Sequence, residues 1–170
     1  VAEARAPMGL NKRDHLRAVL EMPGIVRQWQ SSFSRPWNDD DLDRVYRNFL
    51  PLQGAEAVRF AELIPGTLEC VTALRARGIY IGTTTGYPRA IGQPVAERVA
   101  PIGYRPDHCV FPDDVAAGRP APWMIFRNME ALGVCPPAAG VKVGDTVPDI
   151  EEGRNAGAWS IGVTFPIMTT

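Results

Sequence analysis

The sequence predicts an α/β fold in which a parallel sheet with covering helices follows a small helical unit. From residue 63 onward, short apolar runs alternate with amphipathic helical segments, an order typical of parallel sheets with right-handed crossovers. Before that point, helical periodicity occurs without a convincing strand. We therefore expect two parts, a helical domain over residues 1–62 and an α/β domain over residues 63–170.

The helical part begins with two predicted helices. Apolar residues share one face of residues 12–20, and the break at Met22-Pro23-Gly24 should end that helix. A second helix is expected over residues 25–33.

A third helix is predicted after the turn at Pro36-Trp37-Asn38. Asn38 is a suitable N-cap, and the three aspartates that follow it suit the positive end of a helix. Pro51 should kink or end this helix, and a further helical piece should reach about Glu62.

In the second part, glycines and prolines separate the predicted elements. Pro65-Gly66-Thr67 should open a helix that Gly78 closes, and Pro122 and Gly133 should bound another. Further helices are expected over residues 89–100 and between Asp145 and Gly157. The predicted strands are residues 79–83, 108–111, 141–143 and 159–163.

Composition narrows the function classes. The chain has 170 residues and a net charge of −1, which gives no electrostatic case for nucleic acid or an anionic membrane. No apolar run is long enough to cross a bilayer. Cys70, Cys109 and Cys135 are odd in number and lack metal-site spacing, so we expect reduced thiols. No signal peptide is visible, and we expect a cytoplasmic protein.

A pair of carboxylates follows the predicted strand at residues 141–143. Asp145 lies where that strand ends, and Asp149 lies near the start of the next helix. Two carboxylates at the C-terminal edge of a parallel sheet suit a hard cation with oxygen ligands, Mg2+ above all. The alternative is that both aspartates merely cap a helix, and this stretch alone leaves the two possibilities open.

Groups suited to binding a phosphate follow two other segments. Thr85 and Gly86 come after the strand at residues 79–83, where a hydroxyl and backbone N–H groups can hold an anion. Arg119 could add a bidentate guanidinium contact. Taken singly, a Thr-Gly turn and a loop arginine are also common surface features.

Together, the threonine, the arginine and the aspartate pair resemble the second, third and fourth motifs of the haloacid dehalogenase superfamily. Four longer motifs narrow the resemblance: P-M-G-x-x-K-x-D-H at 7–15, G-T-T-T-G-Y at 82–87, P-D-D-V-x-A-G-R-P-x-P-W at 112–123 and K-V-G-D-T-V-P-D-I-x-E-G-x-N-A-G-x-W at 142–159. They resemble the phosphonoacetaldehyde hydrolase (phosphonatase) family, and the resemblance covers nearly the whole chain.

The resemblance implies a fold, a reaction and a role for each matched residue. The fold is a haloacid dehalogenase-like Rossmannoid parallel sheet with an N-terminal helical cap. The reaction is hydrolysis of the P–C bond of phosphonoacetaldehyde in phosphonate degradation, by a homodimeric enzyme. The implied roles are Schiff-base formation by Lys12, lining of the aldehyde end by Met8, His15 and Tyr87, phosphate binding by Thr85, Gly86 and Arg119, Mg2+ binding by Asp145 and support of the metal by Asp149.

The residue types suit this chemistry. A lysine amine that condenses with the aldehyde forms a protonated imine, which accepts the electrons of the broken P–C bond as an enamine. Lys12 must be neutral to attack, so burial and nearby positive charge should lower its pKa. His15 is placed to relay protons, an aspartate attacks phosphorus, and water hydrolyses the aspartyl phosphate and the imine.

The resemblance also implies missing parts. The family's aspartate nucleophile and first strand would precede Val1, and its C-terminal segment would follow about residue 165. We therefore expect this fragment alone to be inactive. Without the first strand, the strands at 79–83 and 141–143 should flank a gap and form no ladder with each other.

Three functions remain to be weighed. The first is an incomplete record of a working hydrolase, favoured because Lys12, Arg119, Asp145 and Asp149 are all present. The second is a non-catalytic remnant or binding protein that retains the fold. The third, a related phosphatase of another substrate class, is disfavoured by Lys12.

Overall fold

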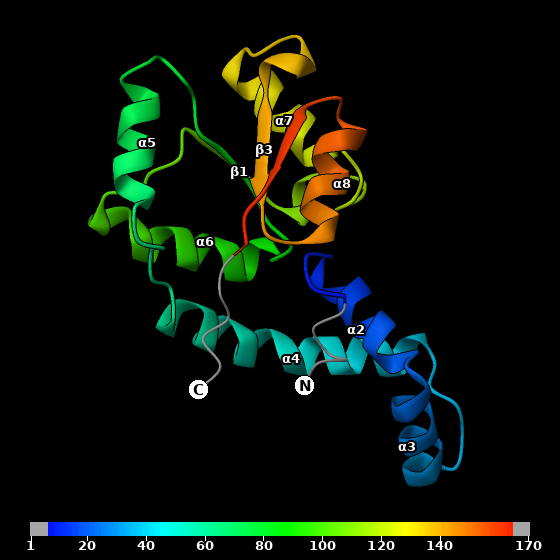
Figure 1. Ribbon diagram of the computed structural model, residues 1–170. Coiled ribbons are helices and arrows are strands. Elements are labelled where there is room, and N and C mark those ends of the chain that lie inside the picture. The colour runs from blue at the N-terminus through cyan, green and yellow to red at the C-terminus, as the bar shows by residue number, and fades with distance from the viewer. Residues whose placement is uncertain (1–6, 165–170) are drawn as a thin grey trace.

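The computed structural model describes residues 7–164, and its N-terminal part is helical (Figure 1). Helix α2 spans Lys12–Leu20 and begins at Asn11, whose side chain accepts a hydrogen bond from the Asp14 N–H. Helix α3 spans Pro23–Phe33. Its start corrects the predicted one at residue 25, because proline fits the first turn of a helix, where no backbone N–H is needed.

Helix α4 spans Asp39–Arg59 and is the longest helix within residues 7–164. Asn38 caps it, as predicted, in a reciprocal capping box with Asp41. Pro51 lies inside the helix and does not end it. Figure 1 shows α4 running beneath α2 and α6, so that it contacts both parts of the chain.

The second part alternates helices and strands as predicted, and every pairing is parallel. Strand β1 pairs with β2, and β3 pairs with β4, in two separate two-stranded sheets. As predicted, no ladder joins β1 and β3 within the described residues. The elements are α5 (Thr67–Arg75), β1 (Gly82–Thr84), α6 (Arg89–Val99), β2 (His108–Val110), α7 (Trp123–Leu132), β3 (Val141–Gly144), α8 (Val147–Asn155) and β4 (Trp159–Gly162), with 3-10 turns at Ala100–Ile102, Pro112–Asp114 and Pro137–Ala139.

The start of β1 differs from the predicted strand at residues 79–83. Ile79 and Tyr80 are exposed, and the Ile81 N–H donates to the Asp107 carboxylate instead of to a neighbouring strand. The ladder therefore begins at Gly82. The glycines that were predicted to end helices behave as expected, since Gly78 and Gly133 both adopt positive φ.

Each sheet packs on its own helix, α7 on β1 and β2, and α8 on β3 and β4. The buried apolar core includes Ile91, Val110 and Met124, and Leu42 is fully buried in the helical part. The other face of the β3–β4 pair is apolar and exposed. Its exposed residues are Val141, Val143, Trp159, Ile161 and Val163. No helix within residues 7–164 is long and apolar enough to cross a membrane.

Candidate functional site

A cleft of about 730 Å³ lies between α2, α4 and the loop after β2. Lys12 lines it from α2, Tyr46 from α4, and Arg119 from the loop. The structure thus places Lys12 and Arg119, which are far apart in sequence, at one cleft.

The loop before α2 also contacts the sheet edge. A Cβ added to Gly86 would lie 2.5 Å from the Leu10 carbonyl oxygen, and a Cβ added to Gly9 would overlap the Thr146 hydroxyl. This loop therefore lies directly against the turns that follow β1 and β3. Glycine is needed at residue 86 because no side chain fits beneath that backbone.

Lys12 is half-buried, and its Nζ lies 5.0 Å from the centre of the Tyr87 ring. Burial, and after it the positive charge of Arg119, lowers the pKa of Lys12 below its ordinary value. Both effects favour the neutral amine, the form that can act as a nucleophile. The sequence predicted this direction of shift and these two causes.

Tyr87 is one of the residues predicted near Lys12, and the structure places its ring beside the Lys12 amine. Burial raises the pKa of the Tyr87 hydroxyl, so it stays protonated at neutral pH. His15 lies one turn after Lys12 on α2 and is half-buried. Met8 is in the loop before α2 and is largely exposed.

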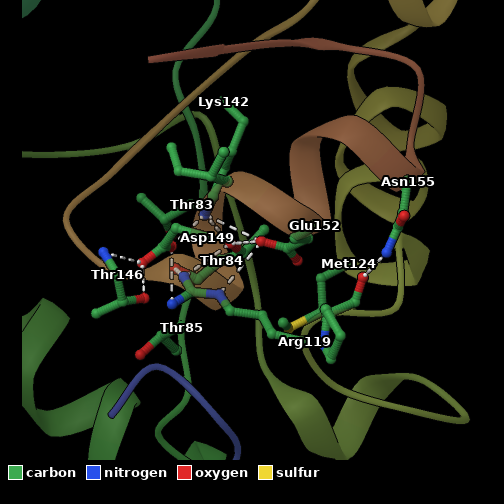
Figure 2. Close-up of polar contacts among 12 residues, drawn as sticks. Thr83, Thr84, Thr85, Arg119, Met124, Lys142, Thr146, Asp149, Glu152 and Asn155 are labelled. Carbon is green, nitrogen blue, oxygen red and sulfur yellow. Dashed lines mark hydrogen bonds and ion pairs between the residues drawn. The ribbon is translucent and has the colours of Figure 1, made fainter. Parts of the chain in front are cut away.

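Arg119 is at the centre of a cluster of charged side chains that lies under this edge of the sheets (Figure 2). Its Nη1 lies 2.9 Å from Asp149 Oδ1, and its Nε lies 3.2 Å from Glu152 Oε2. Its Nη2 donates to both the carbonyl and the hydroxyl oxygen of Thr84, at 2.7 and 3.0 Å. We call Thr84, Arg119, Lys142, Asp149 and Glu152 the sheet-edge cluster.

The contacts of Arg119 change the predicted mode of phosphate binding. A guanidinium has five N–H donors, and the four contacts above use donors on all three nitrogens. One N–H on Nη1 is left over in this arrangement. Arg119 can thus give an additional ligand a single hydrogen bond, whereas the sequence suggested a bidentate contact.

The phosphate-binding turn predicted after β1 begins at Thr85. Its hydroxyl accepts a hydrogen bond from the Tyr87 N–H at 3.1 Å, which folds the turn. In Figure 2, Thr85 lies on the side of the sheet-edge cluster that faces the N-terminal loop. Thr85, Gly86 and Arg119 therefore occur at one edge, as the order of strands predicted.

Asp149 is both a helix cap and an ion-pair partner. Its Oδ2 accepts from the N–H and hydroxyl of Thr146 in a capping box, and its Oδ1 also lies 2.8 Å from Lys142 Nζ. Although burial opposes it, the charge of Arg119 and the hydrogen bonds from Lys142 and Thr146 lower the pKa of Asp149. Asp149 therefore caps α8 and also forms ion pairs with Arg119 and Lys142.

The two aspartates differ in how well they fit a metal. Both oxygens of Asp149 are taken by donors, which suits a supporting carboxylate better than a direct ligand. Asp145 is exposed at the end of β3 and fits a hard-cation ligand by its chemistry. Within residues 7–164, no group of three or more His, Cys, Asp or Glu side chains could hold a metal by itself.

Sequence reasoning missed Lys142 and Glu152. Lys142 Nζ lies 3.0 Å from Glu152 Oε2 and donates to the Thr84 hydroxyl at 2.7 Å. One signal was available for each: Lys142 interrupts an apolar strand, and Glu152 follows Asp149 by one helical turn.

Comparison with known proteins extends over most of the chain. The profile of the hydrolase family described as haloacid dehalogenase-like hydrolase matches residues 2–157. Phosphonoacetaldehyde hydrolase from Salmonella newport (strain SL254) is 47% identical over 164 residues, which cover 96% of this chain and 61% of that protein. The protein of the same name from Bacillus thuringiensis (strain Al Hakam) is 48% identical over 161 residues, covering 95% and 61%.

A solved structure agrees with these matches. The crystal structure of a phosphonoacetaldehyde hydrolase-like protein from Oleispira antarctica superposes with a TM-score of 0.93 at 39% identity, covering 95% of this chain and 59% of that one. The present chain thus spans 61% of the length of the curated relatives named above. The predicted haloacid dehalogenase-like α/β fold is confirmed. The chain belongs to the haloacid dehalogenase-like hydrolase family.

Proposed function

We propose that this chain is the larger part of a phosphonoacetaldehyde hydrolase that works through a lysine Schiff base. The observation that carries the proposal is the shared cleft, which an amine with a lowered pKa and a guanidinium line from two sides. An aldehyde that also bears a phosphonate has the two groups that such a cleft can hold. The similarity to proteins named phosphonoacetaldehyde hydrolase supports this substrate.

In the proposed reaction, the neutral Lys12 amine condenses with the aldehyde and releases water. The protonated imine draws the electron pair of the P–C bond into an enamine while an aspartate outside this chain takes the phosphoryl group. Protonation of the enamine on carbon regenerates an imine, and hydrolysis of this imine and of the acyl phosphate then gives acetaldehyde and phosphate. His15 moves protons during imine formation and hydrolysis, and Tyr87 and Met8 line the aldehyde end.

The phosphonate is proposed to bind at the Thr85–Gly86 turn, with one further hydrogen bond from Arg119. Asp145 would be a ligand of Mg2+ with the support of Asp149, and Mg2+ when bound would neutralise charge on the phosphoryl oxygens. Asp145→Ala in the complete gene product, by which we mean the whole protein encoded by the gene that contains these residues, should abolish turnover. Excess Mg2+ should not restore it, and near-normal turnover would refute this metal assignment.

Trapping the imine tests the Schiff base directly. Borohydride added with phosphonoacetaldehyde should inactivate the complete gene product and leave a reduced adduct on the peptide that contains Lys12. The chain has only two lysines, so Lys142 is the internal control. An adduct on any lysine other than Lys12 would refute the assignment, and no adduct would favour the non-catalytic alternative.

We also propose a division of the chain into two domains, a quaternary state and a cellular compartment. Residues 1–62 would form the cap and residues 63–170 the core, although residues 1–6 and 165–170 lie outside the described part. The protein would be a cytoplasmic homodimer, and the unpaired cysteines agree with a reducing compartment. The 170-residue fragment alone would be inactive. The DNA upstream of residue 1 tests this, because an in-frame D-x-A-G-T segment would supply the nucleophile.

A further inference from the structure

We propose that Glu152 is a positioning residue whose buried carboxylate fixes the Arg119 guanidinium and offsets the charge of Lys142 beside it. The inference rests on the proposed role of Arg119 in phosphate binding. Figure 2 shows the three side chains converging from α8, from the loop after β2 and from β3.

Glu152 has no accessible side-chain surface. Its Oε2 accepts from the Thr84 hydroxyl at 2.9 Å and lies within 3.2 Å of Arg119 Nε and 3.0 Å of Lys142 Nζ. A fully buried carboxylate is costly unless it is paired and hydrogen-bonded. The position of Glu152 one turn after Asp149 directs both carboxylates to the same two cations.

Gly153 provides the space for Lys142. A Cβ on Gly153 would lie 2.7 Å from Lys142 Cβ and would overlap the Ser160 hydroxyl. Only glycine lets the lysine stem lie against the α8 backbone and bring Nζ to Glu152. The local sequence therefore fits an inward-pointing lysine, whereas Val141 and Val143 on the same strand point to the exposed face.

Two carboxylates balance the two cations of the cluster. Arg119 and Lys142 each contact both Asp149 and Glu152. Without the Glu152 charge, two cations would compete for Asp149 Oδ1 and repel each other at close range. Arg119 would then lose the fixed orientation that leaves one N–H free for a ligand.

The effect of Glu152 reaches the phosphate-binding turn through Arg119. Arg119 Nη2 donates to the carbonyl oxygen of Thr84, the residue directly before Thr85 and Gly86. A guanidinium that shifts therefore releases the start of this turn as well. Glu152 thus sets the orientation of two phosphate-binding groups without being expected to contact the substrate.

The experiment measures the affinity of the complete gene product for inorganic phosphate by isothermal titration calorimetry. Glu152→Gln keeps the shape of the side chain and one acceptor oxygen that can face Arg119, but it removes the charge and replaces the other carboxylate oxygen with an NH2 donor. We expect phosphate to bind about tenfold more weakly, within the range of coupling seen for side chains in one network. Glu151→Gln, at an exposed position on the same helix, is the matched control and should bind as the parent does.

A charge-matched second variant separates positioning from a general loss of structure. In Lys142→Met/Glu152→Gln, the competing cation is gone and the introduced amide oxygen can still accept from Arg119. Phosphate affinity should therefore return to within about threefold of the parent. A double variant as weak as Glu152→Gln would overturn the proposal. So would an unchanged affinity in Glu152→Gln.

Two further variants keep the test decisive. An unchanged phosphate affinity in Arg119→Met would show that the proposed phosphate site is wrong. Weaker binding in Arg119→Met but not in Glu152→Gln would show that only the positioning role of Glu152 is wrong. If Glu152→Gln fails to fold, Lys142→Met/Glu152→Ala replaces it. This variant lacks the acceptor for Arg119 and should bind phosphate more weakly than Lys142→Met/Glu152→Gln, whereas equal binding would overturn the proposal.

Discussion

Two clusters of arginine and carboxylate differ in what surrounds them. At the start of α4, Asp41 is 4% exposed, but its partners Arg35 and Arg44 are 45% and 55% exposed. In the sheet-edge cluster, Arg119 and Lys142 are each 9% exposed, Asp149 4% and Glu152 0%. The first cluster buries one charge, whereas the second buries four.

The difference in burial distinguishes a structural ion pair at the start of α4 from a candidate functional site at the sheet edge. An exposed arginine that pairs with a helix-capping carboxylate adds modest stability at little desolvation cost. Four buried charges are costly to assemble, and apolar residues of similar volume often serve stability as well or better. The position of four buried charges at the C-terminal edge of the strands therefore favours a functional role over a purely stabilising one.

The largest expected effect is on the stability of the isolated chain. There, the strands that hold the sheet-edge cluster should be less stable than α4, which holds the other cluster. The 170-residue chain alone should be unstable or aggregation-prone, because β1 and β3 have unpaired edges and the β3–β4 pair exposes an apolar face. Hydrogen exchange should be fast in β1 and β3 and slower in α4. Ordinary solubility with a single cooperative unfolding transition would contradict this prediction.

Removing the central arginine of each cluster compares them directly. In the complete gene product, Arg119→Met should lower the free energy of unfolding by about 3–5 kcal/mol, because it leaves two buried carboxylates with one cation. Arg35→Met should have a clearly smaller effect, since Arg44 remains beside Asp41. Denaturant unfolding of both variants is the measurement, and equal losses would remove the distinction between the clusters.

The effect of the Arg119 charge on the pKa of Lys12 should be measurable as a change in the pH dependence of imine trapping. The charge of Arg119 contributes to the lowered pKa of Lys12. Trapping needs the neutral amine, so its rate rises as pH increases through that pKa. Arg119→Met should raise the Lys12 pKa and move the rise to higher pH. Arg17→Met, which replaces a partly exposed arginine on α2, should leave the rise in place. A profile unchanged by Arg119→Met would show that the two charges do not interact.

The smallest effect concerns the α4 cluster in acid. The hydrogen bond from Arg35 holds the pKa of Asp41 at about 2, below its ordinary value of 3.8. Because the folded-state pKa is depressed, the stability from this group is present above about pH 4 and is lost as pH falls towards 2. Asp41→Asn should remove this part of the pH dependence. Thermal unfolding across this range checks it, and a variant whose acid sensitivity matches the parent would refute it.

Periodicity and turn chemistry predicted the order of helices and strands, because each depends on neighbouring residues. They misplaced the start of β1, where a long-range bond to Asp107 replaces strand pairing. They also suggested that Pro51 could end α4, but packing on α2 and α6 supports the helix on both sides of it.

The candidate site was predictable where strand ends determine it. Thr85 and Asp149 were expected at one edge because parallel strands end there together. Lys142 and Glu152 were not predicted, since a lysine in a short strand and a glutamate in a helix are ordinary surface residues until the tertiary fold brings them together. The neighbourhood of Lys12 and Arg119 followed from the resemblance to a family and not from periodicity.

Helix α4 links the part of the chain that carries Lys12 to the part that carries the sheets. Its 21 residues make a rod of roughly 30 Å at about 1.5 Å per residue, and it touches both α2, which carries Lys12, and α6 beside the sheets. Pro51 removes one internal hydrogen bond from the rod, and a Cβ on Gly54 would lie 3.8 Å from Ile91 of α6. Because α2 and α6 both pack on α4, and α6 contacts it near Gly54, a bend of α4 at Pro51 would move Lys12 relative to the sheets.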